Sequence, residues 1–385
     1  MKEIPFPDGV IPLEIFVGSV GKDRYTDKAE GRGGVVDYGF DYTDRPVSLF
    51  LRIKAADAAD FRLLRNEVFA TFDVGSAFYV AESDVPSRVL KVVVDESYIP
   101  DRLTEEYADF DINCRTLDSV FWESKYTTLE LHDSGFAHSA EKYGLVDNID
   151  DEKVQYRFTN DSTLLTGVQW NDGGIEVSTG AVQPSNLNNI YSNEITVSPG
   201  QRIEFEETSK HPNINYWRAF EYNGNEFIGV IEGQPGTNTV SLTTRGNRIR
   251  FATSVHPNQP VRAGNVGVTI TPQIKRLSNT ANFTVYNAGN VTVEPESMLL
   301  HIFVTSATGD SITIKNNTTG ETFTLNRKMN ARHIQVNGMV VTDGTTQVFR
   351  DTNKRFISLA PGDNSITVTG ATFNEIRFNF KYYYK

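Results

Sequence analysis

Short runs of alternating apolar and polar residues, separated by Gly, Asn, Asp and Pro, recur along this sequence and restrict it to folds built mainly from β-strands. Residues 310–325, DSITIKNNTTGETFTL, predict two strands joined by an Asn/Thr/Gly turn. The stretch 356–369, FISLAPGDNSITVT, repeats this pattern around residues 361–364. No repeat of fixed period accompanies these runs, so we expect sandwiches or barrels and not a solenoid or propeller.

The alternation continues to the last residue. In NEIRFNFKYYYK, a period of two places five apolar or aromatic side chains on one face of a strand: Ile376, Phe378, Phe380, Tyr382 and Tyr384. We therefore expect the C-terminus to be built into a sheet.

One amphipathic helix is expected, over residues 57–72. Its apolar positions follow the i, i+3, i+7, i+11 rhythm of a single stripe: Phe61, Leu64, Val68 and Phe72. Asp57 is placed to cap the N-terminus, and Gly75 lies just beyond the C-terminal end. A short helical turn is also expected over residues 103–107. A lone helix in a β-rich segment usually covers one face of a sheet, so the N-terminal part is predicted to be α+β.

Charge is distributed unevenly. The chain has 385 residues and a net charge of −12, and residues 1–144 hold 27 acidic and 16 basic side chains, a net of −11. An acidic chain is not a general nucleic-acid binder, because that affinity depends on clustered Lys and Arg. Composition predicts linkers near 148–153 and 271–280. The expected domains are residues 1–145, 146–275 and 276–385.

Catalytic and metal-binding motifs are missing from the sequence. There is no G-x-S-x-G, H-E-x-x-H, P-loop or G-x-G-x-x-G pattern, and the six histidines lack metal-ligand spacing. Cys114 is the only cysteine, and we expect it to be a small buried apolar residue. We expect no cofactor and no metal. The N-terminus has no apolar run of signal-peptide length, and no stretch of about 18 apolar residues predicts a membrane span.

Two carboxylate pairs with i, i+2 spacing keep an enzyme in consideration. A glycosidase needs two carboxyl groups on either side of one bond, and Asp109 with Asp111 or Glu204 with Glu206 would share a strand face. Exposed strand faces of an acidic protein carry such pairs without any catalytic role. We prefer the second interpretation.

The middle of the chain is the better place for recognition. Five aromatic residues lie there among Asn, Gln, Asp and Glu: Trp170, Tyr191, Trp217, Phe220 and Tyr222. Sugar binding uses this mixture, since an aromatic ring covers the C–H face of a pyranose while amides and carboxylates bond its hydroxyls. Phe220 and Phe227 are expected in the core. Trp217 and Tyr222 fit either a core or a site, and Trp170 is expected in an exposed loop beside the turn NDGG.

Two separated stretches make the chain resemble the distal tail proteins (Dit) of long-tailed bacteriophages that infect Gram-positive hosts. The first runs from RPVSLFLRIKAADAADFRLLRNEVFATF through KVVVDESYI to ADFDINCRTLDSVFWES, and it looks like the family's ring-forming domain. The second combines the aromatic strand of ANFTVYNAGN with ITIKNNTTG and LAPGDNSI, and it is similar to the galectin-like β-sandwich that closes these proteins.

The segment near 146–275 departs from the bare family pattern. Its YSNEITVSPG and AFEYNGNEFI look like the jelly-roll modules of phage tail and cell-wall proteins, and family members with such additions are called evolved. The resemblance implies that this module binds host saccharide, with candidate contacts at Trp170, Tyr191, Trp217 and Tyr222.

The resemblance implies a virion protein at the distal end of the tail. Six copies would form a ring that joins the tail tube protein to the tip or lysin protein, without enzymatic activity and without a membrane. DNA would pass through the lumen, and the acidic N-terminal domain would repel its phosphates. Two alternatives stay open: a cell-wall glycan hydrolase with an accessory carbohydrate-binding module, and a surface adhesin, which the missing signal peptide disfavours.

Overall fold

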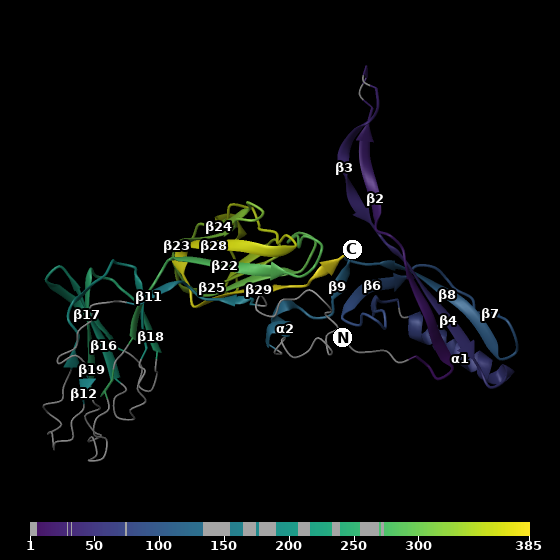
Figure 1. Cartoon of the computed structure of the whole chain (residues 1–385), viewed down its shortest axis with the longest axis horizontal. Helices are drawn as coiled ribbons and strands as arrows, with labels where there is room; N and C mark the ends of the chain where they lie inside the picture. Colours follow the sequence, from purple (N-terminus) through teal and green to yellow (C-terminus); the bar gives the residue numbers. More distant parts are fainter. Residues whose placement is uncertain are drawn as a thin grey trace, which may run out of the picture.

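A computed structural model of the chain describes residues 6–28, 30–31, 33–73, 75–133, 155–164, 175–176, 190–206, 216–232, 239–254, 269–270 and 273–385. Strands predominate over helices in these residues, which confirms a mainly β fold. Figure 1 shows three β-rich bodies in a row and a hairpin that projects from the body containing α1.

The N-terminal body is one antiparallel sheet. Its strands follow the order β1 (Val10–Val17), β4 (Pro46–Lys54), β8 (Tyr107–Thr116), β6 (Arg88–Val94), β9 (Trp122–Ser124) and β30 (Tyr383–Tyr384), with β5 (Phe78–Val80) beside β6 and β7 (Asp101–Arg102) beside β8. Residues 103–106 form the tight turn between β7 and β8. The helical turn expected there is wrong, because the backbone N–H groups of Leu103 and Thr104 bond across the hairpin to the Tyr107 carbonyl.

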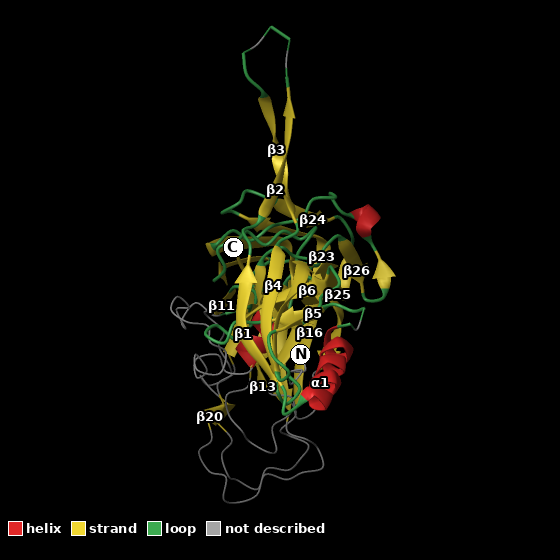
Figure 2. Cartoon of the chain, turned by 90° about the vertical axis from the view of Figure 1, so that its right-hand side faces the viewer, coloured by secondary structure: helices red, strands yellow, loops and turns green. Residues whose placement is uncertain are grey.

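Helix α1 (Ala58–Phe72) confirms the sequence expectation. The Asp57 carboxylate caps it by accepting hydrogen bonds from the backbone N–H groups of Ala59 and Asp60. The buried residues are the predicted stripe: Phe61, Leu64, Val68 and Phe72. They share one core with the inward-facing residues of β4 and β8, and each contributes about 1.5–3 kcal/mol by leaving water. Figure 2 shows α1 lying along one side of the molecule.

The projecting hairpin consists of β2 (Gly21–Asp27) and β3 (Val36–Thr43). These strands pair only with each other within the described residues, and Figure 2 shows the hairpin standing clear of the body. It is joined to the sheet at its base, where the Tyr42 and Phe121 rings meet edge to face with centroids 5.1 Å apart.

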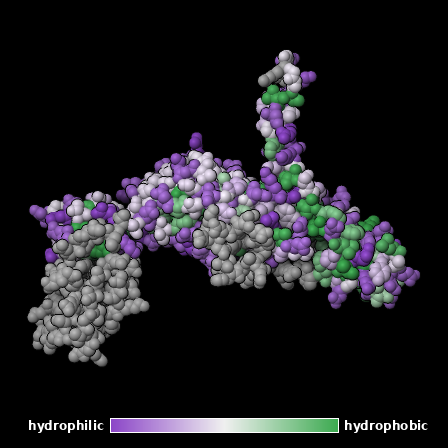
Figure 3. Space-filling view, in the orientation of Figure 1, coloured by the Kyte–Doolittle hydropathy of each residue, from purple (hydrophilic) through white to green (hydrophobic). Residues whose placement is uncertain are grey.

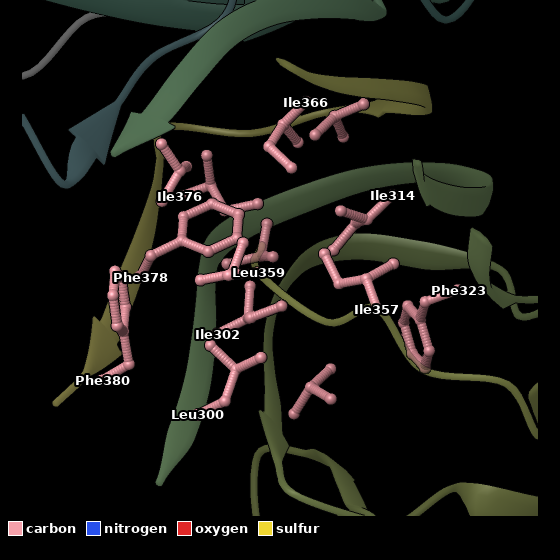
Figure 4. Close-up of a cluster of buried hydrophobic side chains, with 14 of the residues drawn as sticks. Leu300, Ile302, Ile314, Phe323, Ile357, Leu359, Ile366, Ile376, Phe378 and Phe380 are labelled. Atoms are coloured by element: carbon pink, nitrogen blue, oxygen red, sulfur yellow. The ribbon is translucent and has the colours of Figure 1, made fainter. Parts of the chain in front are cut away.

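The C-terminal domain is organised around the long strand β23 (Leu300–Asn316). The other strands are β10 (Arg157–Phe158), β22 (Thr280–Asn287), β24 (Thr322–Leu325), β25 (Met329–Asn337), β26 (Val340–Asp343), β27 (Thr346–Gln347), β28 (Gly362–Thr372) and β29 (Glu375–Phe380). The first half of β23 pairs with β25 and β29, and its second half pairs with β24 and β28. The β23–β24 pairing confirms the hairpin expected over 310–325. Figure 4 shows Ile302 of β23 and Phe378 of β29 directed into one apolar core.

This core includes residues that precede the C-terminal part by more than a hundred positions. Phe121, Leu131 of α2 (Thr128–Asp133), Tyr156 and Phe158 are all buried in it. At the other end of the chain, β30 pairs with β9, so the final residues belong to the sheet of the N-terminal body. The expectation that the C-terminus is built into a sheet is confirmed.

Residues 356–361 do not form the regular strand that their alternation predicts. Leu359 makes a single bridge to Val293, and the buried amide side chains of three asparagines hold the segment instead. Asn316 donates to the Ser358 carbonyl at 2.7 Å, Asn364 donates to the Ala360 carbonyl at 2.7 Å, and Asn287 donates to the Leu359 carbonyl at 3.1 Å. Their side chains replace the ladder bonds of the missing strand.

The middle segment, residues 162–277, contains two larger antiparallel sheets. One has the order β11 (Ser162–Leu164), β21 (Gln273–Leu277), β15 (Arg202–Glu206) and β18 (Thr239–Thr243). The other has the order β13 (Ile190–Tyr191), β19 (Arg248–Ser254), β16 (Tyr216–Asn223) and β17 (Glu226–Glu232), with β14 (Ile195–Thr196) also beside β19; β12 (Ile175–Glu176) and β20 (Thr269–Ile270) form a separate pair. Both larger sheets contribute buried residues: Ile195, Val197, Ile203, Ala219, Leu242, Ile249, Phe251 and Ile274.

The chain enters and leaves this segment at one point. The amide of Asn160 donates to the Ser278 carbonyl at 2.8 Å and accepts from the Phe373 backbone N–H at 2.6 Å. Nearby, the buried guanidinium of Arg202 donates to the Ser306 carbonyl at 3.4 Å. The linker expected over 271–280 is wrong for residues 273–277, which form β21, and the linker expected at 148–153 lies outside the described residues.

Candidate functional site

The projecting hairpin exposes apolar and aromatic side chains along its length. Val35 and Tyr38 are 67% and 68% exposed, and Tyr25, Phe40 and Tyr42 are also exposed. Its pairing is supported by the Arg24–Asp37 ion pair and by a 2.6 Å hydrogen bond from the Tyr25 hydroxyl to Asp41. A two-stranded hairpin is at best marginally stable alone in water, so these side chains are suited to contact another protein surface.

Strand β1 is an edge strand of the N-terminal sheet. It pairs with β4 on one side, and no strand among the described residues pairs with its other side. Ile11, Leu13 and Phe16 are exposed on it, with Phe16 at 49%. Figure 3 shows hydrophobic side chains gathered over this part of the body. A long edge strand with exposed apolar residues is a surface that accepts a further strand or hairpin.

The solvent-facing side of β4 and β8 is polar. Arg52 donates to both oxygens of Asp109 at 2.6 and 2.7 Å, and this hydrogen bonding lowers the pKa of the Asp109 carboxyl. Asp111 is exposed on the same face. Asp109 is therefore held as an ion-pair partner, which favours the non-catalytic interpretation of the Asp109–Asp111 pair.

Cys114 is buried in β8, as expected, and burial raises its pKa to about 12. A thiol with so high a pKa is not a nucleophile at neutral pH. Within the described residues, His, Cys, Asp and Glu side chains form no group of three or more that could hold a metal ion. None of the described helices has the length and apolar character needed to cross a bilayer.

Three of the four candidate sugar contacts lie on described backbone. Tyr191 is in β13, Trp217 is in β16 and Tyr222 is further along β16, while Trp170 lies outside the described residues. The register pairs Tyr191 with Ala252 and Trp217 with Thr253, both in β19. Tyr222 is the candidate whose side chain is described: it is half-buried, and the Arg248 guanidinium lies 5.9 Å from its ring centroid.

Phe227 is not a core residue, so that expectation is wrong. It lies in β17 with 54% of its surface exposed, and its ring centroid is 5.7 Å from that of Tyr222. Phe220 is half-buried on the neighbouring strand. Alternation within WRAFEYNGNEFIGVI predicts strands correctly, but it does not indicate which sheet face has a second layer against it.

The sequence of the N-terminal body can be compared with known families. Residues 9–114 match the family model of the phage tail protein RIFT-related domain. This match covers the central strands β1, β4, β6 and β8, helix α1 and the projecting hairpin. The matched residues thus contain both the exposed hairpin and β1, whose outer edge is unpaired among the described residues.

Two solved structures are similar to the chain at low sequence identity. The crystal structure of SPP1 Dit (gp 19.1), described as a paradigm of the hub adsorption apparatus in phages infecting Gram-positive bacteria, has a TM-score of 0.44 and 9% identity, covering 97% of this chain and 94% of that one. The phage p2 baseplate in its activated conformation has a TM-score of 0.28 and 7% identity, covering 70% and 90%. No curated protein matches the sequence.

Proposed function

We propose that this protein is the structural hub of a phage tail tip or baseplate, located in the virion at the distal end of the tail. Six copies form a ring through the N-terminal body and join the tail tube protein to the tip or lysin protein. The proposal is supported by the phage tail domain match over residues 9–114 and by the resemblance of the two separated sequence stretches to the distal tail family. The hub has no catalytic role.

The main observation in support of a ring is the projecting hairpin of β2 and β3. Its Val35 and Tyr38 side chains are exposed, and covering them with another protein surface lowers the free energy of the assembly. In a closed ring, the hairpin of one copy contacts the next copy around the edge strand β1, where Ile11 and Phe16 are exposed. Each copy then supplies one hairpin and one edge, which makes the interface heterologous, and a rotation of one sixth of a turn between copies closes it into a ring.

The negative charge of the N-terminal body would make the lumen of the ring repel DNA. Residues 1–144 carry a net charge of −11, and a ring multiplies this charge around its channel. DNA then passes through without specific binding, since a negative wall repels phosphate. A ring structure whose lumen surface is neutral or basic would contradict this part of the proposal.

The middle segment is proposed to bind host cell-wall polysaccharide during adsorption, with Trp170, Tyr191, Trp217 and Tyr222 as candidate contacts. Single sugar sites are weak, and six copies on a ring raise avidity by roughly 10² or more through effective concentration. Labelling of host cells by the full chain, weakened in Trp217→Ala, tests this part; no labelling by the wild-type ring would overturn it.

Native mass spectrometry and negative-stain microscopy of the full chain test the ring. We expect a species of six 43.1-kDa chains with a central channel for the wild type. Replacing Val35 and Tyr38 together by Ser should shift it to monomers, because the covered apolar area is lost. Met339→Ser is the matched control, since Met339 is 51% exposed on the C-terminal domain. A wild-type chain that stays monomeric at tens of micromolar, or a double variant that still forms rings, contradicts the proposal.

A further inference from the structure

The two faces of the β19–β16–β17 sheet differ in character. Ala219 and Glu221 of β16 are buried, as are their partners Phe251 and Ile249 of β19, so this face is the inner one. Strand alternation directs Tyr222 to the opposite face. The sheet lies in the body farthest from the N-terminal body in Figure 1.

Two aromatic rings meet on this outer face. Tyr222 and Phe227 are paired across β16 and β17, with ring centroids 5.7 Å apart and an angle of 62° between their planes. Phe220 continues the row, 6.4 Å from Phe227. Ile228 and Val230 are exposed beside them on β17. Phe227, Ile228 and Val230 thus form a contiguous apolar patch on β17, the edge strand of this sheet among the described residues, and such patches often mark binding surfaces.

The cations nearest these rings are already paired. Arg248, which lies over the Tyr222 ring, donates to Glu194 at 2.6 Å and to Asn225 at 3.2 Å. On the same strand, Arg250 is the register partner of Phe220, and its Nε donates to the Ser192 carbonyl at 2.9 Å. Both guanidinium groups are thus engaged by acceptors of the protein, and a phosphate-rich polymer needs uncompensated Lys or Arg, so the face favours a neutral ligand.

Polar groups border the rings on one side. Asn223, Asn225 and Glu226 are exposed at the turn that joins β16 to β17. Amides donate and accept hydrogen bonds, and a carboxylate accepts them, which matches the alternating donors and acceptors of sugar hydroxyls. An apolar ring surface next to such groups complements a molecule with one C–H face and one hydroxyl edge.

We propose that this face binds an uncharged pyranose unit of a polysaccharide, with Phe227 as the stacking platform and Tyr222 beside it. The proposal rests on the saccharide-binding role of the middle segment and defines its position and ligand class. Phe227 covers the C–H face of the sugar. The Tyr222 ring, inclined at 62° to that of Phe227, contacts the side of the sugar, and the amides of the turn bond its hydroxyls. An apolar protein surface is the competing occupant.

The test uses the full chain, on an array of neutral and acidic pyranose oligosaccharides and on purified Gram-positive cell walls. We expect binding to neutral glycans, weakened about tenfold or more in Phe227→Ala, weakened in Tyr222→Ala and retained in Phe227→Tyr. Met339→Ala, another exposed apolar residue, should bind like the wild type. Because Phe227 is exposed, Phe227→Ala should keep the wild-type melting temperature, which separates lost binding from lost folding.

Each outcome has a distinct meaning. Binding by the wild type that Phe227→Ala leaves unchanged overturns this site and leaves the saccharide role intact. Binding confined to acidic glycans overturns the ligand class. A wild-type chain that binds neither glycans nor cell walls overturns the saccharide role and the site together.

Discussion

The C-terminal domain and the middle segment are both β structures, yet they differ in which side chains they bury. The C-terminal core contains many aromatic side chains, including Phe378, Phe380 and Tyr382, and it tolerates buried asparagines because their amides are fully bonded. Among the middle-segment side chains whose burial the structure describes, Phe251 is the only fully buried aromatic, and Phe227 faces solvent. Aromatic residues of the C-terminal domain thus stabilise its core, whereas Phe227 of the middle segment lies on the surface, where we propose that it binds a ligand.

The largest expected effect is in the C-terminal domain. Asn364→Ala removes an amide that accepts from the Ala360 backbone N–H at 2.9 Å and donates to the carbonyls of Ala360 and Gly362. Leaving these buried groups unpaired should lower the free energy of unfolding by about 3 kcal/mol. Urea denaturation measures it. The exposed Asn330→Ala should change little, and equal effects of the two variants would show that the amide network does not hold residues 356–361.

The middle segment should respond next, and separately. Arg245→Ala removes the guanidinium from the buried Glu221 carboxylate, which among the described residues then keeps the backbone N–H of residue 245, at 2.7 Å, as its donor. A charge without a counter-ion is left in a small core. We expect a loss of about 2 kcal/mol, reduced from that of a fully buried pair because Arg245 is itself half exposed.

Hydrogen exchange resolved by peptide checks where this loss occurs. Protection should fall in β16 and β19 and stay unchanged in β23 and β29, because the two cores open independently. Arg355→Ala, at an exposed arginine of the C-terminal domain, is the control and should leave protection unchanged in both domains. Loss of protection in both domains would mean that they unfold as one unit and that the contrast between them is wrong.

Local patterns predict much of the fold and little of this contrast. The stripe from Phe61 to Phe72 and the alternation from Ile376 to Phe380 could be predicted because periodicity is a local property. The two-face pattern predicted beyond Phe380 is wrong, because Tyr382, Tyr383 and Tyr384 are all buried. Phe227 was misassigned to the core because alternation does not show which face has a second layer. The strand predicted over residues 356–361 does not form, because the amides that hold this segment come from β22, β23 and β28, and a local pattern does not show these contacts. The exposure of the hairpin likewise depends on what lies around it.

The junction between the two domains should give a smaller effect. Asn160→Ala removes one bond to the Ser278 carbonyl and one from the Phe373 N–H, for a loss of about 1–2 kcal/mol. The middle segment should then reorient more freely, and small-angle scattering should show a wider distribution of radii of gyration. Asn353→Ala, which breaks bonds within the C-terminal domain only, is the comparison. Identical scattering from both variants would rule out Asn160 as the element that fixes the orientation.

The smallest effect is a pH dependence confined to the C-terminal domain. Burial lowers the pKa of His301 in β23 below its ordinary 6.5, although a hydrogen bond to Asn337 opposes this. The unfolded chain therefore binds the proton more readily, so the contribution of His301 to stability is present above about pH 6.5 and is lost as the pH falls toward the folded pKa.

His301→Gln should flatten the decline in the urea midpoint between pH 7.5 and 5.5, whereas His333→Gln, at an exposed position of β25, should keep it. Since His301 pairs with Asn379 of β29 and Asn337 of β25, exchange protection should decline with pH in these strands first. An equal loss of exchange protection in β16 and β19 would assign the pH dependence to groups outside the C-terminal core. It would also show that protonation in one domain affects the stability of the other.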